Sequence, residues 1–230
     1  LGIPVFMGQG DVAAYAKTHG LGTEAAARTL RYEFLASLSP GAKIATAHNA
    51  QDNLETMLFH LVRGTGAKGL MGIPPVRGRI IRPLIEVERR EIEAFLRERG
   101  QDFVTDSTNA DTAYTRNRLR QEVVPVLREL NPQAAQAAAR LSRQLRQDET
   151  CLQSYAQTCV QLCAVGNGAW KIQPLREAAP AVRSRALRLL LENADMPLKD
   201  VTAKHITALE HLLEPASPSA EADLPNGYFA

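Results

Sequence analysis

The sequence predicts an α/β domain built on a parallel sheet, followed by a mainly helical domain. Two observations indicate this order. Short apolar runs alternate with amphipathic helical stretches in the first half, and helical periodicity dominates from about residue 115 onward. Strands that alternate with helices are typical of a parallel sheet, because each helix carries the chain back to the start of the next strand. The expected boundary lies near Asn131, where Asn131-Pro132 ends a helix.

Apolar runs, caps and breakers give the elements of the first half. We expect strands at residues 3–7, 43–47 and 80–81, and helices at residues 11–18, 23–38, 50–63 and 88–99. A glycine-rich connection, residues 63–75, follows the third helix. It has some likeness to a phosphate cradle. However, it lacks the Gly-Lys-Ser/Thr ending of a P-loop and follows a helix instead of a strand, so we do not assign it to a Walker-type site.

The second half reads as helices joined by short breaks. After a polar loop at residues 106–111, we expect helices at 117–130, 133–164, 177–193 and 200–213, and a short strand at 169–172. The expected division is therefore one domain at residues 1–131, a helical domain at 132–215, and the start of a truncated C-terminal segment at 216–230.

Composition is that of an ordinary globular protein, with 45% hydrophobic and 23% charged residues. No apolar run approaches the roughly 20 residues that span a membrane, and no signal peptide pattern is present, so we expect a cytoplasmic protein. Cys159 and Cys163 are spaced to share a helix face, but no further ligand lies near them. We interpret them as small buried apolar residues and expect no metal site. A net charge of +2 does not indicate a nucleic-acid binder, although arginine outnumbers lysine and comes in short groups.

The most informative stretch is residues 47–56, where a strand-like run ends and a helix begins. It places His48, Asp52 and Glu55 at positions i, i+4 and i+7. In open α/β sheets this edge is where ligands bind, and the two acids lie away from the apolar stripe of the helix. The alternative is that acids in a first turn only complement the helix dipole on a solvated face. The pattern alone leaves both readings open.

Six stretches, taken in order, resemble motifs of the bacterial tRNA(Ile)-lysidine synthetases (TilS), which belong to the N-type ATP pyrophosphatases. The resemblance is close over about residues 1–135 and looser beyond. The stretches are Thr23-Glu24-Ala25-Ala26-Ala27-Arg28 with Arg31-Tyr32; His48-Asn49-Ala50-Gln51-Asp52-Asn53-Leu54-Glu55-Thr56; Arg63-Gly64-Thr65-Gly66 with Gly69-Leu70; Arg82-Pro83-Leu84; Asp106-Ser107-Thr108-Asn109; and Tyr114-Thr115-Arg116-Asn117-Arg118-Leu119-Arg120.

This resemblance implies a fold and a domain plan. Residues 1–131 would form a Rossmann-like, adenine nucleotide α hydrolase-like catalytic domain, and residues 132–215 a helical domain that binds tRNA or substrate. Two departures stand out. The superfamily's Ser-Gly-Gly-x-Asp-Ser ATP loop does not occur in the 230 residues, so we expect this chain to be inactive as a ligase by itself. Gln51 stands where relatives often have an acid.

The resemblance also implies an activity. The family uses ATP with Mg²⁺ to adenylate the C2 oxygen of the wobble cytidine in tRNA(Ile) with a CAU anticodon. The ε-amine of free L-lysine then attacks C2 and expels AMP, which leaves lysidine. The implied partners are therefore tRNA(Ile) and free L-lysine, with no membrane, and a homodimer is left open.

The matching positions give each candidate residue a role. His48, Asp52 and Glu55 would be the catalytic set, in which Asp52 and Glu55 bind the lysine ammonium. Arg28 would contact ATP. Candidates for phosphates of ATP or tRNA are Arg63, Arg82, Arg116 and Arg120. For each of these arginines, a structural salt bridge is the alternative.

Three other functions remain as alternatives. Another ATP-pyrophosphatase that modifies tRNA is one, although thiolating enzymes of that kind use Cys-x-x-Cys pairs, which this sequence lacks. A metallohydrolase with His48, Asp52 and Glu55 as ligands is another. The third is a non-catalytic fragment that only binds tRNA.

Overall fold

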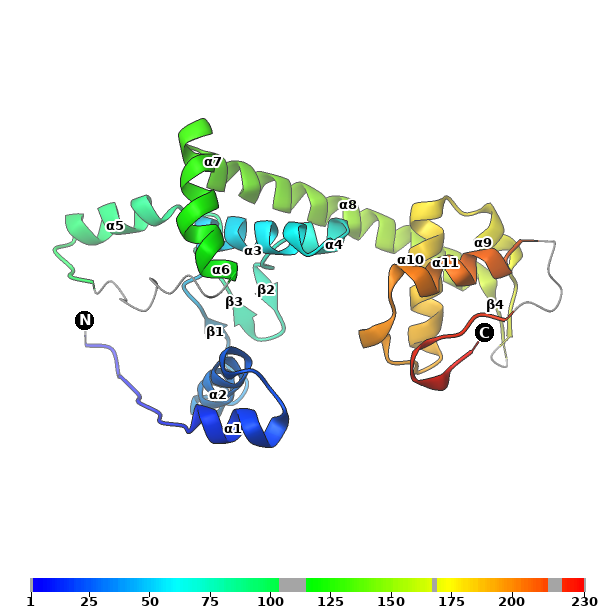
Figure 1. The fold of residues 1–230 in the computed structure, drawn as a ribbon, viewed down its shortest axis with the longest axis horizontal. Helices are drawn as coiled ribbons and strands as arrows, with labels where there is room; N and C mark the ends of the chain where they lie inside the picture. The colour runs from blue at the N-terminus through cyan, green and yellow to red at the C-terminus, as the bar shows by residue number, and fades with distance from the viewer. Residues whose placement is uncertain (1, 104–114, 167–168, 215–220, 230) are drawn as a thin grey trace. The chain divides into compact units, whose positions relative to one another are not determined.

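The structure is a computed structural model that describes residues 2–103, 115–166, 169–214 and 221–229. The chain forms two compact units, residues 1–141 and residues 142–230, each of which is described by itself (Figure 1). Helices predominate in both units, and the first contains a small sheet. Among the described residues, no helix is both long and apolar enough to cross a membrane.

The first unit begins with a helical hairpin of α1 (Val12–His19) and α2 (Thr23–Leu38). Asp11 caps α1 by accepting the N–H of Ala14 at 2.9 Å, and Gly20 ends α1 in the left-handed conformation with φ of 62°. Both predicted helices are confirmed. The strand predicted at residues 3–7 is wrong: this segment pairs with no strand among the described residues, so its backbone lacks the ladder that defines a strand. Its apolar side chains are exposed.

The sheet of the first unit has three short strands, β1 (Ile44–Ala45), β2 (Val76–Arg77) and β3 (Ile80–Ile81). Their order is β1-β3-β2, with β1 parallel to β3 and β2 antiparallel to β3. The sheet is therefore mixed, and the predicted parallel pairing holds for β1 and β3 only. Strand β2 was not predicted from the sequence, because its two residues are too few to form an apolar run. It is followed by a turn at Gly78, whose φ is 57°.

The helices that follow β1 and β3 frame the polar stretch of interest. They are α3 (Ala50–Val62), the single turn α4 (Ala67–Leu70) inside the glycine-rich connection, and α5 (Arg89–Glu98). The predicted helices at 50–63 and 88–99 are confirmed, and α4 was not predicted. Helix α3 is the next element after β1, as expected from the sequence, and β1 is the strand that pairs in parallel with β3.

A helical path with an irregular middle closes the first unit. It consists of α6 (Thr115–Arg118), a π-helical turn η2 (Leu119–Val123) and α7 (Val124–Leu130). Pro125 has no backbone N–H to donate to the preceding turn, which accounts for the widened turn before it. A small apolar core joins α3 to this path and to the start of α8: Ala50, Leu54, Met57, Val124, Ala135 and Ala138.

The second unit is built on a larger apolar core. Helix α8 (Ala134–Cys163) supplies its C-terminal part to this unit. After it come the antiparallel strands β4 (Ala164–Gly166) and β5 (Ala169–Trp170), then α9 (Gln173–Glu177), α10 (Pro180–Asn193), η3 (Leu198–Asp200), α11 (Ala203–Leu212) and η4 (Pro225–Gly227). The helix predicted at 177–193 begins only at Pro180. The domain boundary near Asn131 stays a prediction, since the two compact units divide after Leu141, within α8.

The two cysteines spaced along α8 lie in this second core, as the sequence predicts. Cys163 is fully buried and Cys159 is 6% exposed, among leucines of α9, α10 and α11. Burial raises the pKa of the Cys163 thiol to about 11. The thiol is therefore neutral near pH 7, and it packs as a small apolar group.

Candidate functional site

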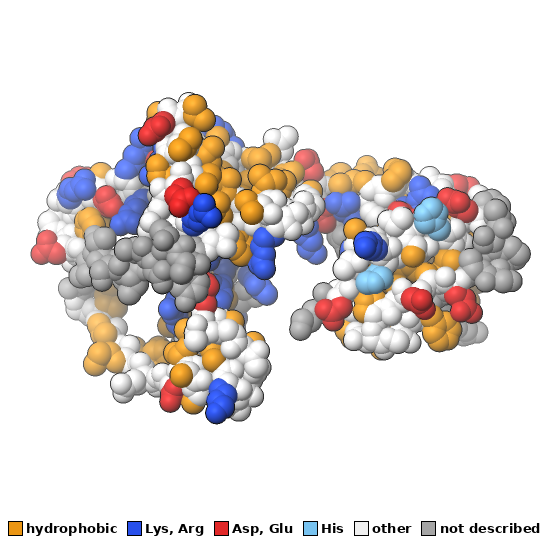
Figure 2. Space-filling model, viewed as in Figure 1, with side chains coloured by type: hydrophobic (Ala, Val, Ile, Leu, Met, Phe, Trp, Pro, Cys, Tyr) orange, Lys and Arg blue, Asp and Glu red, His pale blue; other side chains and the backbone are white. Residues whose placement is uncertain are grey.

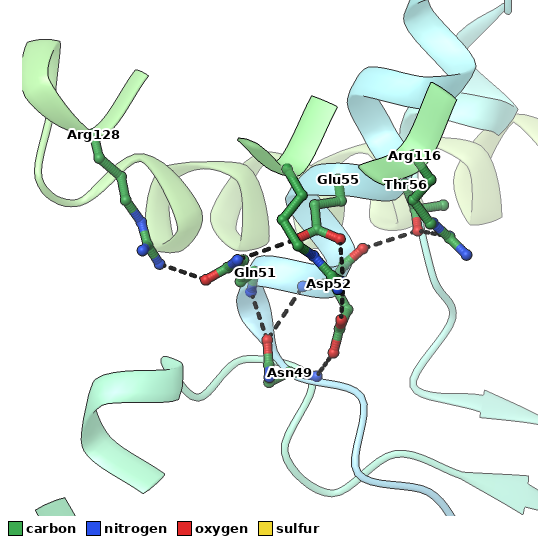
Figure 3. A network of polar contacts seen from close by, with 8 residues as sticks. Asn49, Gln51, Asp52, Glu55, Thr56, Arg116 and Arg128 are labelled. Carbon is green, nitrogen blue, oxygen red and sulfur yellow. Dashed lines mark hydrogen bonds and ion pairs between the residues drawn. The ribbon is translucent and has the colours of Figure 1, made fainter. Parts of the chain in front are cut away.

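The start of α3 is fixed by a capping box. The side-chain oxygen of Asn49 accepts the N–H groups of Gln51 and Asp52 at 2.9 and 3.2 Å (Figure 3). In return, Oδ2 of Asp52 accepts the N–H of Asn49 at 2.9 Å. These bonds satisfy backbone donors that every helix leaves unpaired in its first turn. One oxygen of Asp52 therefore has a structural role, and the other, Oδ1, does not take part in the cap.

Glu55 lies one turn further along α3 and is 1% exposed. Its two carboxylate oxygens receive two parallel bonds from Arg120 of η2, Nε to Oε1 at 2.8 Å and Nη2 to Oε2 at 2.6 Å. Nε2 of Gln51 donates a third bond, to Oε1 at 3.0 Å. A buried carboxylate requires such partners, because an unpaired charge inside a protein is very costly.

Arg120 brings the two acids into one cluster. Its Nη2 lies 3.5 Å from Oδ1 of Asp52 as well as 2.6 Å from Oε2 of Glu55. The hydrogen bond to Glu55 raises the pKa of the guanidinium, and it remains charged. From the sequence, Arg120 was a candidate phosphate ligand. The structure places it against Asp52 and Glu55, and its role toward phosphate stays a prediction.

His48 is half-buried at the end of β1, with Nδ1 2.8 Å from the hydroxyl oxygen of Thr46. Burial lowers the pKa of His48, and the positive charges of Arg82, Arg28 and Arg116 lower it further, while the charge of Asp52 opposes them. The ring is therefore neutral near pH 7 and able to accept a proton. No described contact joins His48 directly to Glu55.

A pocket of about 350 Å³ collects Arg28, His48 and Asp52, which the sequence had selected separately. The guanidinium of Arg28 lies 5.2 Å from the centre of the Tyr32 ring, within cation–π distance. The other lining residues are Arg31, Tyr32, Leu35, Thr46 and Ala47. Arg31 and Tyr32 were not chosen as site residues. Their spacing of three and four from Arg28 puts them on the same face of α2, and this was the signal available.

The remaining candidate arginines differ in position. Arg82 is 4% exposed, and its Nη1 donates to the carbonyl of Pro74 at 2.6 Å. Nη2 of Arg116 donates to the hydroxyl of Thr56 at 2.8 Å, and Thr56 is the residue that follows Glu55. Both act on the charge state of His48, so both belong to the site region. Arg63 is exposed at the end of α3, and its guanidinium lies over the Phe59 ring at 4.8 Å, outside the pocket. The resemblance also rested on Asp106–Asn109 and Tyr114, which lie outside the described residues.

Asn53 is a structural residue that sequence reasoning did not single out. It is 1% exposed, and its Oδ1 accepts the N–H of Ile73, twenty residues away, at 2.8 Å. Gly72, with φ of 61°, lies so close that a Cβ there would be 2.2 Å from that oxygen. Asn53 therefore ties the glycine-rich connection to α3, and Gly72 permits the close approach.

His48, Asp52 and Glu55 do not form a metal-ligand set. Within the described part of the chain, no three or more His, Cys, Asp or Glu side chains gather closely enough to hold a metal ion. Both oxygens of Glu55 instead face a guanidinium. The arrangement is a pair of carboxylates bridged by Arg120, beside a pocket lined by Arg28 and Arg31.

Comparison with known families identifies the family of the chain. Residues 1–127 match the model of a PP-loop domain, and residues 171–228 match the model of the TilS substrate binding domain. The chain belongs to the TilS family of PP-loop proteins. A PP-loop domain implies an adenine nucleotide α hydrolase-like fold and the use of ATP, and the described part of this TilS domain shows a small mixed sheet among helices.

Curated relatives extend the match over nearly the whole chain. The chain is 36% identical over 230 residues to a protein of Geobacter sulfurreducens named tRNA(Ile)-lysidine synthase. This alignment covers 96% of the chain and 49% of the relative. The chain is 36% identical over 229 residues to the protein of that name from Geobacillus kaustophilus, covering 94% and 49%. Over 143 residues it is 48% identical to the one from Thermosipho africanus, covering 61% and 34%. The chain thus spans about half or less of the length of these TilS relatives.

Proposed function

We propose that this protein catalyses the ATP-dependent ligation of lysine to the wobble cytidine of tRNA(Ile) with a CAU anticodon, forming lysidine. The observation that carries the proposal is a combination within one chain. A PP-loop domain presents the half-buried Asp52 and the buried Glu55 beside a pocket lined by arginines, and a TilS substrate binding domain follows it. Relatives that share this combination are named tRNA(Ile)-lysidine synthase. ATP, lysine and tRNA meet in the cytoplasm, where we place the reaction.

The proposed reaction has two steps. The C2 oxygen of the cytidine attacks the α-phosphorus of ATP, and pyrophosphate leaves. The ε-nitrogen of lysine then attacks C2, the C2–oxygen bond breaks, and AMP departs with that oxygen. The amine arrives as an ammonium and must lose a proton before it can act as a nucleophile. The site must therefore bind anions in the first step and a cation in the second.

The pocket beside α2 suits the anionic part of the reaction. Arg28 and Arg31 of α2 line this pocket. His48, which follows β1, and Asp52, in the first turn of α3, line it as well. A guanidinium group can donate two parallel hydrogen bonds to phosphate oxygens. We therefore assign Arg28 and Arg31 to the phosphates of ATP. Mg²⁺ is expected to accompany ATP. Among the described residues, no group of three or more acidic, histidine or cysteine side chains could hold this ion, and we assign no residue to Mg²⁺.

The carboxylates suit the cationic part, but unequally. Oδ1 of Asp52 has only a 3.5 Å approach from Arg120, and its side chain is 28% exposed. Glu55 is 1% exposed and holds Arg120 with both oxygens. We therefore propose that the lysine ammonium first meets Asp52, and that it competes with Arg120 for Glu55. This refines the sequence-based hypothesis, in which the two acids had equal roles.

Neutral His48 is the proposed acceptor of the ammonium proton. It shares the pocket with Asp52, and its lowered pKa keeps it unprotonated near pH 7. With Nδ1 facing Thr46, the other ring nitrogen is the one available to substrate. Arg116, close to Glu55 through Thr56, is proposed to contact an RNA phosphate. Lysine and arginine side chains occur in several separate groups on the face seen in Figure 2, consistent with contacts to an extended polyanion.

The test uses the protein expressed from its complete gene, a tRNA(Ile) transcript with a CAU anticodon, ATP and labelled lysine. We expect lysine-dependent AMP release and label at the wobble position, and no label in a transcript that carries uridine there. The alternatives predict other results. A thiolating enzyme would require a sulfur donor and incorporate no lysine, a metallohydrolase would act without ATP, and a pure binding protein would release no AMP.

A further inference from the structure

Gln51 occupies a junction in the site that the proposed mechanism does not use. It is half-buried in the first turn of α3, between the capping residue Asn49 and the acid Asp52. Its Nε2 donates to Oε1 of Glu55 at 3.0 Å, and its Oε1 accepts from Nη2 of Arg128 on α7 at 2.8 Å (Figure 3). Gln51 therefore links the buried carboxylate to an exposed arginine.

The two neighbours fix which way the amide points and which residue type fits. A carboxylate only accepts hydrogen bonds and a guanidinium only donates them, so the amide must turn its nitrogen to Glu55 and its oxygen to Arg128. An acid at position 51, which relatives often have, would satisfy Arg128 but repel Glu55 four residues away, so this chain differs from them in the charge of its site. A lysine or arginine there would satisfy Glu55 but repel Arg128. A neutral amide meets both neighbours at once.

This arrangement controls the charge of the cation site. Asp52 and Glu55 carry two negative charges, and Arg120, bonded to both, carries one positive charge. One negative charge is left, which a single lysine ammonium would neutralise. Because Gln51 is neutral, it supplies a hydrogen bond to Glu55 without altering that balance. Its amide shares Oε1 of Glu55 with Nε of Arg120, while Nη2 of Arg120 bonds the other oxygen.

We propose that Gln51 is a positioning residue for the lysine step: it orients the Glu55 carboxylate toward the ammonium with a neutral donor, and Arg128 holds it in place. This inference rests on the proposed function. Adenylation of the cytidine does not use Glu55 and should not depend on Gln51. Because Gln51 acts on the lysine only through Glu55, the expected effect is modest, roughly a 2- to 10-fold change in the KM for lysine.

The experiment compares Gln51→Leu, which keeps a similar volume but removes both bonds, with Arg128→Gln, which removes only the outer contact. Gln157→Glu, an exposed glutamine on α8, is the control for a remote change. In the full-length protein, pyrophosphate release reports adenylation, and lysine-dependent AMP release reports the second step. We expect Gln51→Leu to raise the lysine KM roughly 2- to 10-fold, Arg128→Gln to raise it less, and neither to change the adenylation rate.

Each other outcome counts against the inference. An unchanged lysine KM in Gln51→Leu would overturn it, and so would an equal loss in both steps, which would indicate only a structural role. A thermal melt of each variant separates these results from unfolding. If the unaltered protein shows no lysine-dependent AMP release, the proposed function itself fails. If it shows normal release and the variants match it, only the role of Gln51 fails.

Discussion

The two compact units bury different kinds of side chain. The first unit, which contains the candidate site, buries charged groups, and the second buries an apolar core. In the first unit the described residues under 5% exposed include Glu55, Asn53, Arg82 and Glu88. In the second, the described buried residues are apolar except for Ser142. Buried charges are costly and rarely add net stability compared with apolar packing. The charged side chains that the described part of the chain buries most deeply lie in the first unit, which also contains the candidate site.

The largest expected effect comes from neutralising the buried acid. Glu55→Gln leaves the guanidinium of Arg120 with Asp52, at 3.5 Å, in place of its closer charged partner, and we expect a loss of about 3 to 4 kcal/mol in the free energy of unfolding. The estimate is at the low end of the range for buried pairs because the Arg120 side chain is 28% exposed. Urea denaturation measures it. Glu93→Gln, which breaks exposed pairs with Arg89 and Arg97 on α5, is the matched control and should cost about 0.5 kcal/mol or less.

An apolar deletion in the second unit should come next. Leu175 is 2% exposed in the core of that unit, and Leu175→Ala should cost about 2 to 3 kcal/mol through lost burial and a cavity. Leu162→Ala, at a side chain that is 64% exposed on α8, is the control and should cost well under about 1 kcal/mol. Calorimetry at two pH values checks both variants. A strong pH dependence of the Leu175→Ala effect would break the contrast drawn between the units.

The cap of α3 should contribute less than either core. Asn49→Ala removes the acceptor for the N–H groups of Gln51 and Asp52, and we expect a loss of about 1 kcal/mol. Thermal unfolding with circular dichroism measures it. A loss near zero would mean that the helix start is held by the Asp52 half of the box and by the β1 connection instead.

The smallest effect is electrostatic and concerns His48. Since the charge of Asp52 opposes the lowering of the His48 pKa by burial, Asp52→Asn should lower this pKa further. Arg28→Ala should act in the opposite direction. Because the folded pKa lies below the ordinary value of 6.5, the unfolded chain binds the proton more readily. Stability from this group is thus fully present above pH 6.5, and it is lost as the pH falls from there through the lowered pKa of the folded state. An NMR titration of the ring gives the sign directly.

The sequence predicted the elements better than their pairing. Helices α2 and α3 followed from caps and periodicity, which are local. The β2–β3 hairpin and the failure of residues 3–7 to pair were not predictable in this way, because a strand exists only through a partner distant in the chain. The two-residue strands also fall below the length at which periodicity is informative.

The sequence selected candidate residues that lie close together in the structure, but it did not predict the contacts between them. The spacing of His48, Asp52 and Glu55 selected residues that the structure brings near one pocket or one ion cluster. That Arg120, 65 residues after Glu55, bonds both of its oxygens could not be read from the sequence, since nothing local relates the two positions. The same holds for Arg128 and Gln51, which lie 77 residues apart.

The central claim is that the Asp52–Glu55 pair receives the lysine ammonium, and single-turnover kinetics in the full-length protein tests it most directly. Adenylation, followed by pyrophosphate release, and lysidine formation at limiting and saturating lysine would be measured for Asp52→Asn and Glu55→Gln, beside a thermal melt. We expect near-normal adenylation in folded Asp52→Asn and a lysine-limited rate reduced by about 10- to 150-fold, the range of one charge-assisted contact. Normal lysine dependence in both variants, measured at a temperature where the melt shows each to be folded, would contradict this role.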